Sequence, residues 1–119
     1  MISSGVNTRE LILEILLQIE EEGEHSHIAI RNALSKYQFL PKQDRAFITR
    51  VCEGTLEYRI QIDYIINSFS KVTVDKMKPA IREILRSAVY QLKYMDSVPD
   101  SAVCNEAVKL AQRKGFYNL

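Results

Sequence analysis

Apolar residues recur three and four positions apart along nearly the whole chain, and this helical period constrains the fold more than any other feature. Glycine, proline and polar clusters interrupt the pattern and divide it into about six segments. No alternating strand pattern with turn dipeptides appears between these segments. We therefore predict an all-α fold, a compact bundle of about six helices in which residues 1–119 form a single domain.

The interruptions also predict where helices begin and end. Asn7 is placed as an N-cap, and Gly23 as the end of the first helix. Pro41 separates the second helix from the third, and "SKVTVDKMKP" is the best loop candidate. The expected helices cover residues 7–23, 26–37, a stretch from 42 onward, 62–69, 79–95 and 100–115.

Charge argues against a globally basic nucleic-acid-binding protein. The 16 basic and 15 acidic side chains leave a formal net charge of +1, so no overall field draws the molecule to a polyanion. The halves differ, because residues 1–59 carry 7 basic and 9 acidic side chains whereas residues 60–119 carry 9 basic and 6 acidic ones. A polyanion site is therefore expected in the second half.

Signals for export, membrane insertion and catalysis are not found in the sequence. The longest apolar stretch, "LILEILLQI", is shorter than the ~20 residues of a membrane span, and no secretory signal precedes it. Cys52 and Cys104 are predicted to be buried free thiols. No nucleophile–base pair, metal set or phosphate loop appears. We expect a cytoplasmic protein that contacts no membrane and has no catalytic or metal-binding residue in this segment.

Four cations share one flank of the fifth predicted helix. With Ile81 placed at 0° and about 100° added per residue, the apolar stripe centres near 0° and the cations fall at roughly 60–140°. On the same wheel Glu83 points to the far side, at about 200°, and Tyr90 projects opposite the apolar centre. The four cations are Lys78, Arg82, Arg86 and Lys93.

This row of cations has three interpretations. No acid follows Arg82 or Arg86 at three or four positions, so pairing of that kind within the helix does not explain it. The cations could form a solvated shoulder, or pair with acids of other helices, such as Asp63 or Glu106. They could also follow a phosphate backbone, whose oxygens suit the forked donors of arginine. The residues alone leave the three open.

A resemblance to a known family extends this interpretation. In "AIREILRSAVYQLKYMDSVPDSAVCNEAVKLAQRKG", residues 80–115, an Ile-Leu-Arg helix leads through Tyr-Gln-Leu to a proline, and an Asn-Glu-Ala-Val helix ends in glycine. This stretch resembles the signature of the NusB-like RNA-binding fold. The residues that carry the likeness are Arg82, Ile84, Leu85, Arg86, Tyr90, Leu92, Pro99, Asn105, Glu106, Ala107, Val108 and Gly115.

Two versions of this fold are candidates. "QDRAFITRVCEGTLEYRIQIDYIINSFSK", residues 43–71, looks like the N-terminal domain of the 16S rRNA cytosine-C5 methyltransferases, and "VNTRELILEIL" fits it as well. The other version is the transcription antitermination factor, whose arginine-rich N-terminal stretch is reduced here to Arg9. Relative to the family, the chain is expected to lack the last helix. The S-adenosylmethionine-binding domain of the methyltransferases and its catalytic cysteines are also missing.

The resemblance implies an N-terminal, RNA-binding fragment of a longer methyltransferase. It would dock 16S ribosomal RNA for a catalytic domain in cis that binds S-adenosylmethionine, and this segment would itself bind no cofactor. The RNA-binding residues expected are Lys78, Arg82, Arg86 and Lys93, with Arg9 in addition. The alternatives are an antitermination factor, or a protein-interaction module that forms a homodimer through apolar surface left by the missing helix.

Overall fold

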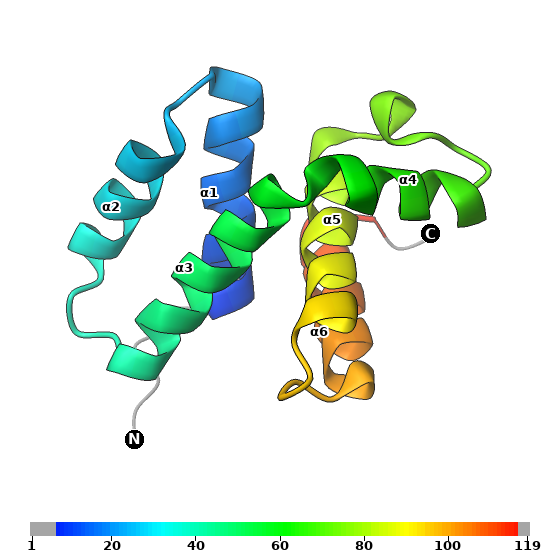
Figure 1. The fold of residues 1–119 in the computed structure, drawn as a ribbon. Coiled ribbons are helices and arrows are strands. Elements are labelled where there is room, and N and C mark those ends of the chain that lie inside the picture. Colours follow the sequence, from blue (N-terminus) through cyan, green and yellow to red (C-terminus); the bar gives the residue numbers. More distant parts are fainter. Residues whose placement is uncertain (1–6, 117–119) are drawn as a thin grey trace.

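The computed structural model describes residues 7–116, and within that range it contains six α-helices and no strand (Figure 1). This confirms the all-α prediction. One short 3₁₀ helix, η1, precedes the fifth α-helix. The elements are α1 (Thr8–Glu22), α2 (Ser26–Lys36), α3 (Lys42–Glu57), α4 (Arg59–Phe69), η1 (Val74–Lys76), α5 (Pro79–Tyr94) and α6 (Asp100–Arg113).

The helix ends follow the capping residues read from the sequence. The Asn7 side chain accepts a hydrogen bond from the backbone N–H of Glu10 at 2.9 Å, which satisfies one of the unpaired donors at the start of α1. Gly23 ends α1 in the left-handed conformation, with φ of 72°, which glycine adopts without steric cost. Pro79 occupies the first turn of α5, where its missing N–H has no helical partner to lose.

Helix α5 lies at the centre of the bundle. It packs against α1, α3, α4 and α6, whereas α2 packs against α1 and α3 at one side of the molecule. Figure 1 shows α1, α2 and α3 grouped on one side of α5 and α4 on the other, and α6 runs alongside α5 and also contacts α1. The main core is formed by side chains from all five helices α1 through α5. Its fully buried side chains include Ile12, Leu16, Ile48, Val51 and Ile62.

This central position explains why the wheel of α5 misplaced two side chains. Glu83 and Tyr90, expected on the far side, are 1% and 5% exposed. Leu92, on the apolar stripe, is 40% exposed. A helix surrounded by four others buries more than its apolar stripe, and polar or aromatic residues on the second buried face are not marked by hydrophobic period. The prediction for the two far-side residues was therefore wrong.

A glycine lets α3 and α5 approach closely. A Cβ atom at Gly54 would lie 2.1 Å from Cζ of Tyr90 and 2.4 Å from its hydroxyl oxygen. Only a residue without a side chain therefore fits under this ring. The ring is held from other sides by Tyr94 and Tyr58, whose ring centres lie 5.3 and 6.4 Å away in stacked orientations. The tip of the Tyr90 ring is thus fixed against the backbone of α3.

The structure also tests two further expectations, the burial of both cysteines and the lack of a membrane-spanning helix. Cys52 is fully buried, and burial raises the pKa of its thiol, whereas Cys104 is exposed, which corrects the prediction that both are buried. In the part of the chain from 7 to 116, none of the helices combines the length and the apolar character that crossing a lipid bilayer requires.

Because Gly54 lies against Tyr90, the effect of a substitution at Gly54 on stability should depend on which residue occupies position 90. We expect Gly54→Ala to lower the free energy of unfolding by about 1–3 kcal/mol, because the added methyl group overlaps the Tyr90 ring. In a Tyr90→Leu background the same change should stabilise α3, by up to about 1 kcal/mol, because alanine favours a helix over glycine. Urea denaturation of the four proteins measures both effects. A gain in stability from Gly54→Ala with Tyr90 present would contradict the contact.

Candidate functional site

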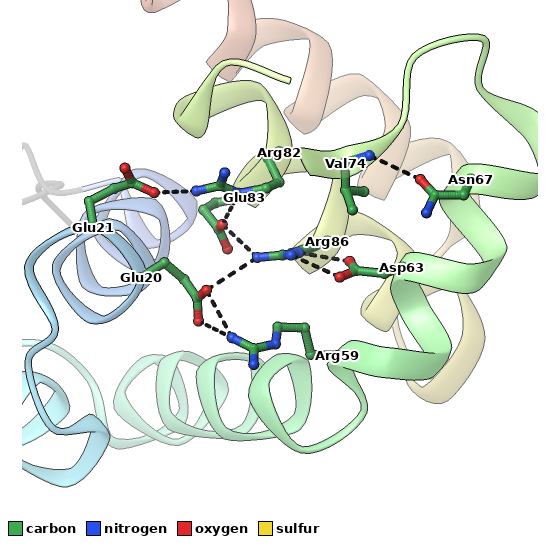
Figure 2. A network of polar contacts seen from close by, with 9 residues as sticks. All are labelled: Glu20, Glu21, Arg59, Asp63, Asn67, Val74, Arg82, Glu83 and Arg86. Atoms are coloured by element: carbon green, nitrogen blue, oxygen red, sulfur yellow. Dashed lines mark hydrogen bonds and ion pairs between the residues drawn. The ribbon is translucent and has the colours of Figure 1, made fainter. Parts of the chain in front are cut away.

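Arg86 lies in a cage of carboxylates contributed by three helices (Figure 2). Its Nε and Nη2 donate to the two carboxylate oxygens of Asp63 from α4, both at 2.8 Å. Its Nη1 donates to Glu83 of α5 at 2.9 Å and to Glu20 of α1 at 3.5 Å. All three guanidinium nitrogens are therefore used inside the bundle, and the side chain is only 8% exposed.

Arg82 and Arg59 extend this network at its two sides. Arg82 donates from Nε to Glu83 at 2.8 Å and from Nη2 to Glu21. Arg59 donates from Nη1 to Glu20 at 2.7 Å. Figure 2 shows the carboxylates of α1 and the arginine side chains of α4 and α5 pointing toward one another. The network thus connects the first helix of the chain with the fourth and the fifth.

The network carries more negative than positive charge. Four carboxylates, those of Glu20, Glu21, Asp63 and Glu83, surround three guanidinium groups, which leaves a formal charge of −1. Burial raises the pKa of the Glu83 carboxyl, against the opposing effects of Arg82 and Arg86. Burial also disfavours the charged form of Arg86, but the hydrogen bonds to Asp63 and the surrounding carboxylates outweigh it, and its pKa is raised. Both arginines therefore stay charged and paired.

For Arg82 and Arg86, this geometry distinguishes among the three interpretations of the cation row. Both arginines pair with acids of other helices, which was the second interpretation of the row. Asp63, the partner of Arg86, is one of the acids named there. Glu83 lies three residues before Arg86 on the same helix and pairs with it. Only acids that follow each arginine were considered in the sequence, so this pair was missed. Their forked donors are directed at carboxylates, and the network that holds them would repel a phosphate.

The other expected RNA-binding residues lie apart from one another. Arg9 donates from Nη2 to Gln91 at 3.3 Å, and its guanidinium carbon lies 5.2 Å from the ring centre of Phe47. Lys78 and Lys93 are exposed at opposite ends of α5, about 22 Å apart along the axis at ~1.5 Å per residue. Within residues 7–116 neither lysine forms an ion pair. The structure therefore does not bring the five predicted residues together.

The surface has two further hollows, one beside α6 and one along α3. An apolar groove of about 520 Å³ separates α6 from the start of α5 and the segment before it. Lys78 stands at this groove, and the apolar lining includes Met77, Ile81, Leu85, Val108, Ala111 and Phe116. A second hollow, of about 530 Å³ and lined mainly by charged and small residues, follows the outer face of α3. Sequence reasoning missed it, although its lining residues recur at helical spacing between positions 42 and 57. In the described range 7–116, no cluster of His, Cys, Asp and Glu suits a metal ion.

Comparison with known proteins identifies relatives of two kinds. The model of the NusB family matches residues 6–118. Two probable ribosomal RNA small subunit methyltransferases B, from Bacillus subtilis and Synechocystis, are 30% and 32% identical over 92% and 96% of this chain. The matched part is 24% and 25% of those proteins, so the chain spans about a quarter of their length.

Antitermination proteins form the second group of relatives. The transcription antitermination protein NusB of Acetivibrio thermocellus is 31% identical over 88% of this chain and 72% of its own length. Among solved structures, the antitermination factors NusB and NusE in complex with double-stranded RNA include a chain similar to this one, with a TM-score of 0.83 and 17% identity. That match covers 92% of this chain and 82% of the other, and it shows a shared fold.

The carboxylate cage predicts a large difference between two arginines of the same network. Arg86→Met should lower the free energy of unfolding by about 3–5 kcal/mol, because it leaves buried Glu83 and its neighbours without their counter-charge. Arg59→Met, at a pair whose arginine is 45% exposed, should cost less than about 1 kcal/mol. Urea denaturation at neutral pH measures both. Equal costs for the two variants would show that the cage is not a buried network.

Proposed function

The chain belongs to the NusB family, and from that premise we propose that it is the RNA-binding domain of a methyltransferase acting on small-subunit ribosomal RNA. The observation that carries the proposal is the match of 92–96% of the chain to two probable ribosomal RNA small subunit methyltransferases B. In this proposal the domain docks 16S ribosomal RNA. A catalytic domain elsewhere in the same polypeptide binds S-adenosylmethionine and methylates one cytosine.

The structure suggests a division of work among the basic side chains. Arg82 and Arg86 maintain the fold, because their donors are bonded to carboxylates. RNA contact falls to exposed cations, among which Lys78 and Lys93 lie at the two ends of α5. Arg9 contributes less, since its side chain packs on Phe47. Phosphate contacts of this kind position RNA without reading its sequence.

A second candidate is an antitermination factor of the NusB type. It is favoured by the NusB protein of Acetivibrio thermocellus, because this chain matches 72% of that protein's length. A third, a module that binds another protein or a second copy of itself, is favoured by the apolar groove between α5 and α6. Exposed apolar surface of this kind often marks an interaction site.

Deletion of the gene segment in the source organism distinguishes the first two candidates. The proposal predicts the loss of methylation at one cytosine of small-subunit ribosomal RNA, measured by bisulfite sequencing, with unchanged transcription through the ribosomal RNA operons. Normal methylation with reduced transcription through these operons would support the antitermination factor instead.

The salt dependence of RNA binding tests the division of work among the cations. The double variant Lys78→Ala, Lys93→Ala should reduce the log–log slope of affinity against salt by about 1.4–1.8, because each lost phosphate contact contributes roughly 0.7–0.9. The ligand is a set of 16S ribosomal RNA fragments, and affinity is measured by filter binding.

A matched control uses two exposed cations of α2. Arg31→Ala with Lys36→Ala removes the same charge at a distance from α5 and should leave the slope unchanged. An equal loss of slope in the two double variants would mean that α5 has no special role in contacting RNA.

A further inference from the structure

The outer face of α3 forms a shallow hollow lined by charged and small residues. Its lining recurs at three- and four-residue spacing, so the side chains share one side of the helix. Ala46, Thr49 and Gly54 are the small residues of this lining, which they share with five charged side chains and Tyr90. The lining used below consists of Lys42, Thr49, Arg50, Glu53, Gly54 and Glu57. The face is long enough for an extended ligand but is not enclosed.

A tyrosine from α5 reaches this hollow from the core side. Tyr90 is 5% exposed, yet it lines the hollow together with Gly54. The hydroxyl end of its ring is the part that meets Gly54. Within residues 7–116 the hydroxyl forms no hydrogen bond, whereas the neighbouring Tyr94 hydroxyl donates to Gln61. Among these residues the fully buried polar atoms without a partner are Arg9 Nε and Thr55 Oγ1, and the Tyr90 hydroxyl is not one of them. A mostly buried side chain thus presents an unused, solvent-accessible polar group at the hollow.

Charge is distributed unevenly along this face. Lys42 and Arg50 lie toward the start of α3, and Glu53 and Glu57 toward its end. Arg50 uses Nη2 to donate to the backbone carbonyl of Tyr94 at 3.1 Å, which fixes the side chain and leaves Nε and Nη1 for another acceptor. Arg45 is held toward the end of α2, since its Nη1 donates to the backbone carbonyls of Leu34 and Tyr37. The start of the hollow therefore suits an anion, and its end suits a hydrogen-bond donor.

From this arrangement we infer that the α3 hollow binds a nucleotide unit of single-stranded RNA. A backbone phosphate lies against Arg50, and Lys42, about two turns earlier on α3, faces the neighbouring part of the RNA backbone. The ribose hydroxyl of the same unit donates to Glu53, and the Tyr90 hydroxyl bonds the exposed edge of the sugar or base. Residues one turn apart on a helix are ~5–6 Å apart, which is the scale of one nucleotide. This inference rests on the proposed RNA-binding function and assigns to it a site that the α5 row does not provide.

The carboxylates make the site selective for RNA over DNA. Glu53 and Glu57 repel phosphate at their end of the hollow, so the ligand is oriented with its phosphate toward Arg50. A carboxylate accepts a hydrogen bond from a ribose 2′-hydroxyl, the group that DNA lacks. Binding through this hollow should therefore depend on the sugar, whereas phosphate contacts by exposed lysines should not.

Removal of single polar groups tests the site with little risk to the fold. The probes are a single-stranded RNA of about 12 nucleotides, within the ~4–16 that such modules cover, and a DNA of the same sequence. Tyr90→Phe keeps the ring against Gly54 and should weaken RNA binding by roughly three- to tenfold, the effect of one lost hydrogen bond. Arg50→Gln should reduce the salt slope for RNA by about 0.7. Fluorescence anisotropy measures both.

The preference for RNA is tested by a third variant. Glu53→Gln should reduce the ratio of RNA to DNA affinity, because an amide oxygen is a weaker acceptor than a carboxylate. The controls are Tyr64→Phe, at a tyrosine of α4 that is 76% exposed, and Arg31→Gln on α2. Both should match the unchanged protein, and urea midpoints of all variants confirm that the fold is retained.

The outcomes separate this site from the proposed function. If the 119-residue chain binds the RNA but Tyr90→Phe and Arg50→Gln behave as their controls do, the α3 site is overturned and RNA binding stands. If the unchanged chain binds neither the short RNA nor 16S ribosomal RNA fragments, both proposals fail. Equal affinity for the RNA and the DNA would overturn the role given to the ribose hydroxyl.

Discussion

The buried guanidinium of Arg86 is the constraint on which the rest of the structure depends. A charge removed from water must be compensated nearby, and here Asp63, Glu83 and Glu20 provide that compensation from α4, α5 and α1. The bidentate contact with Asp63 fixes direction as well as distance, since both oxygens are used at 2.8 Å. Helices distant in the sequence are thereby held in one relative orientation around α5.

Under the proposed function, this network leaves RNA contact to the edge of the molecule. Its carboxylates outnumber its arginines, so the centre of α5 offers no attraction to a polyanion. The cations that we propose to contact RNA are ones that the network does not use, at the ends of α5 and along α3. Even the close approach of α3 and α5 at Gly54 serves this arrangement, because it carries the Tyr90 hydroxyl from the core to the α3 surface.

The sequence predicted local features well and the environment of α5 poorly. Asn7, Gly23 and Pro79 marked helix ends because capping depends on neighbours within a few residues. Glu83 was placed on the wrong side because a wheel assigns one buried face to a helix, whereas α5 is enclosed by four others. Whether Arg86 meets phosphate or carboxylate depends on where α1 and α4 pack, and helical period does not contain that information.

The most direct test of the central claim is nuclear magnetic resonance of the arginine side chains, with and without RNA. We expect the Nε–H of Arg86 to exchange slowly with water at neutral pH, and its resonance not to move when 16S ribosomal RNA fragments are added, because Asp63 already accepts its hydrogen bond. The Arg50 signal should move in the same titration. Rapid exchange at Arg86, or a shift of its resonance on adding RNA, would contradict the account.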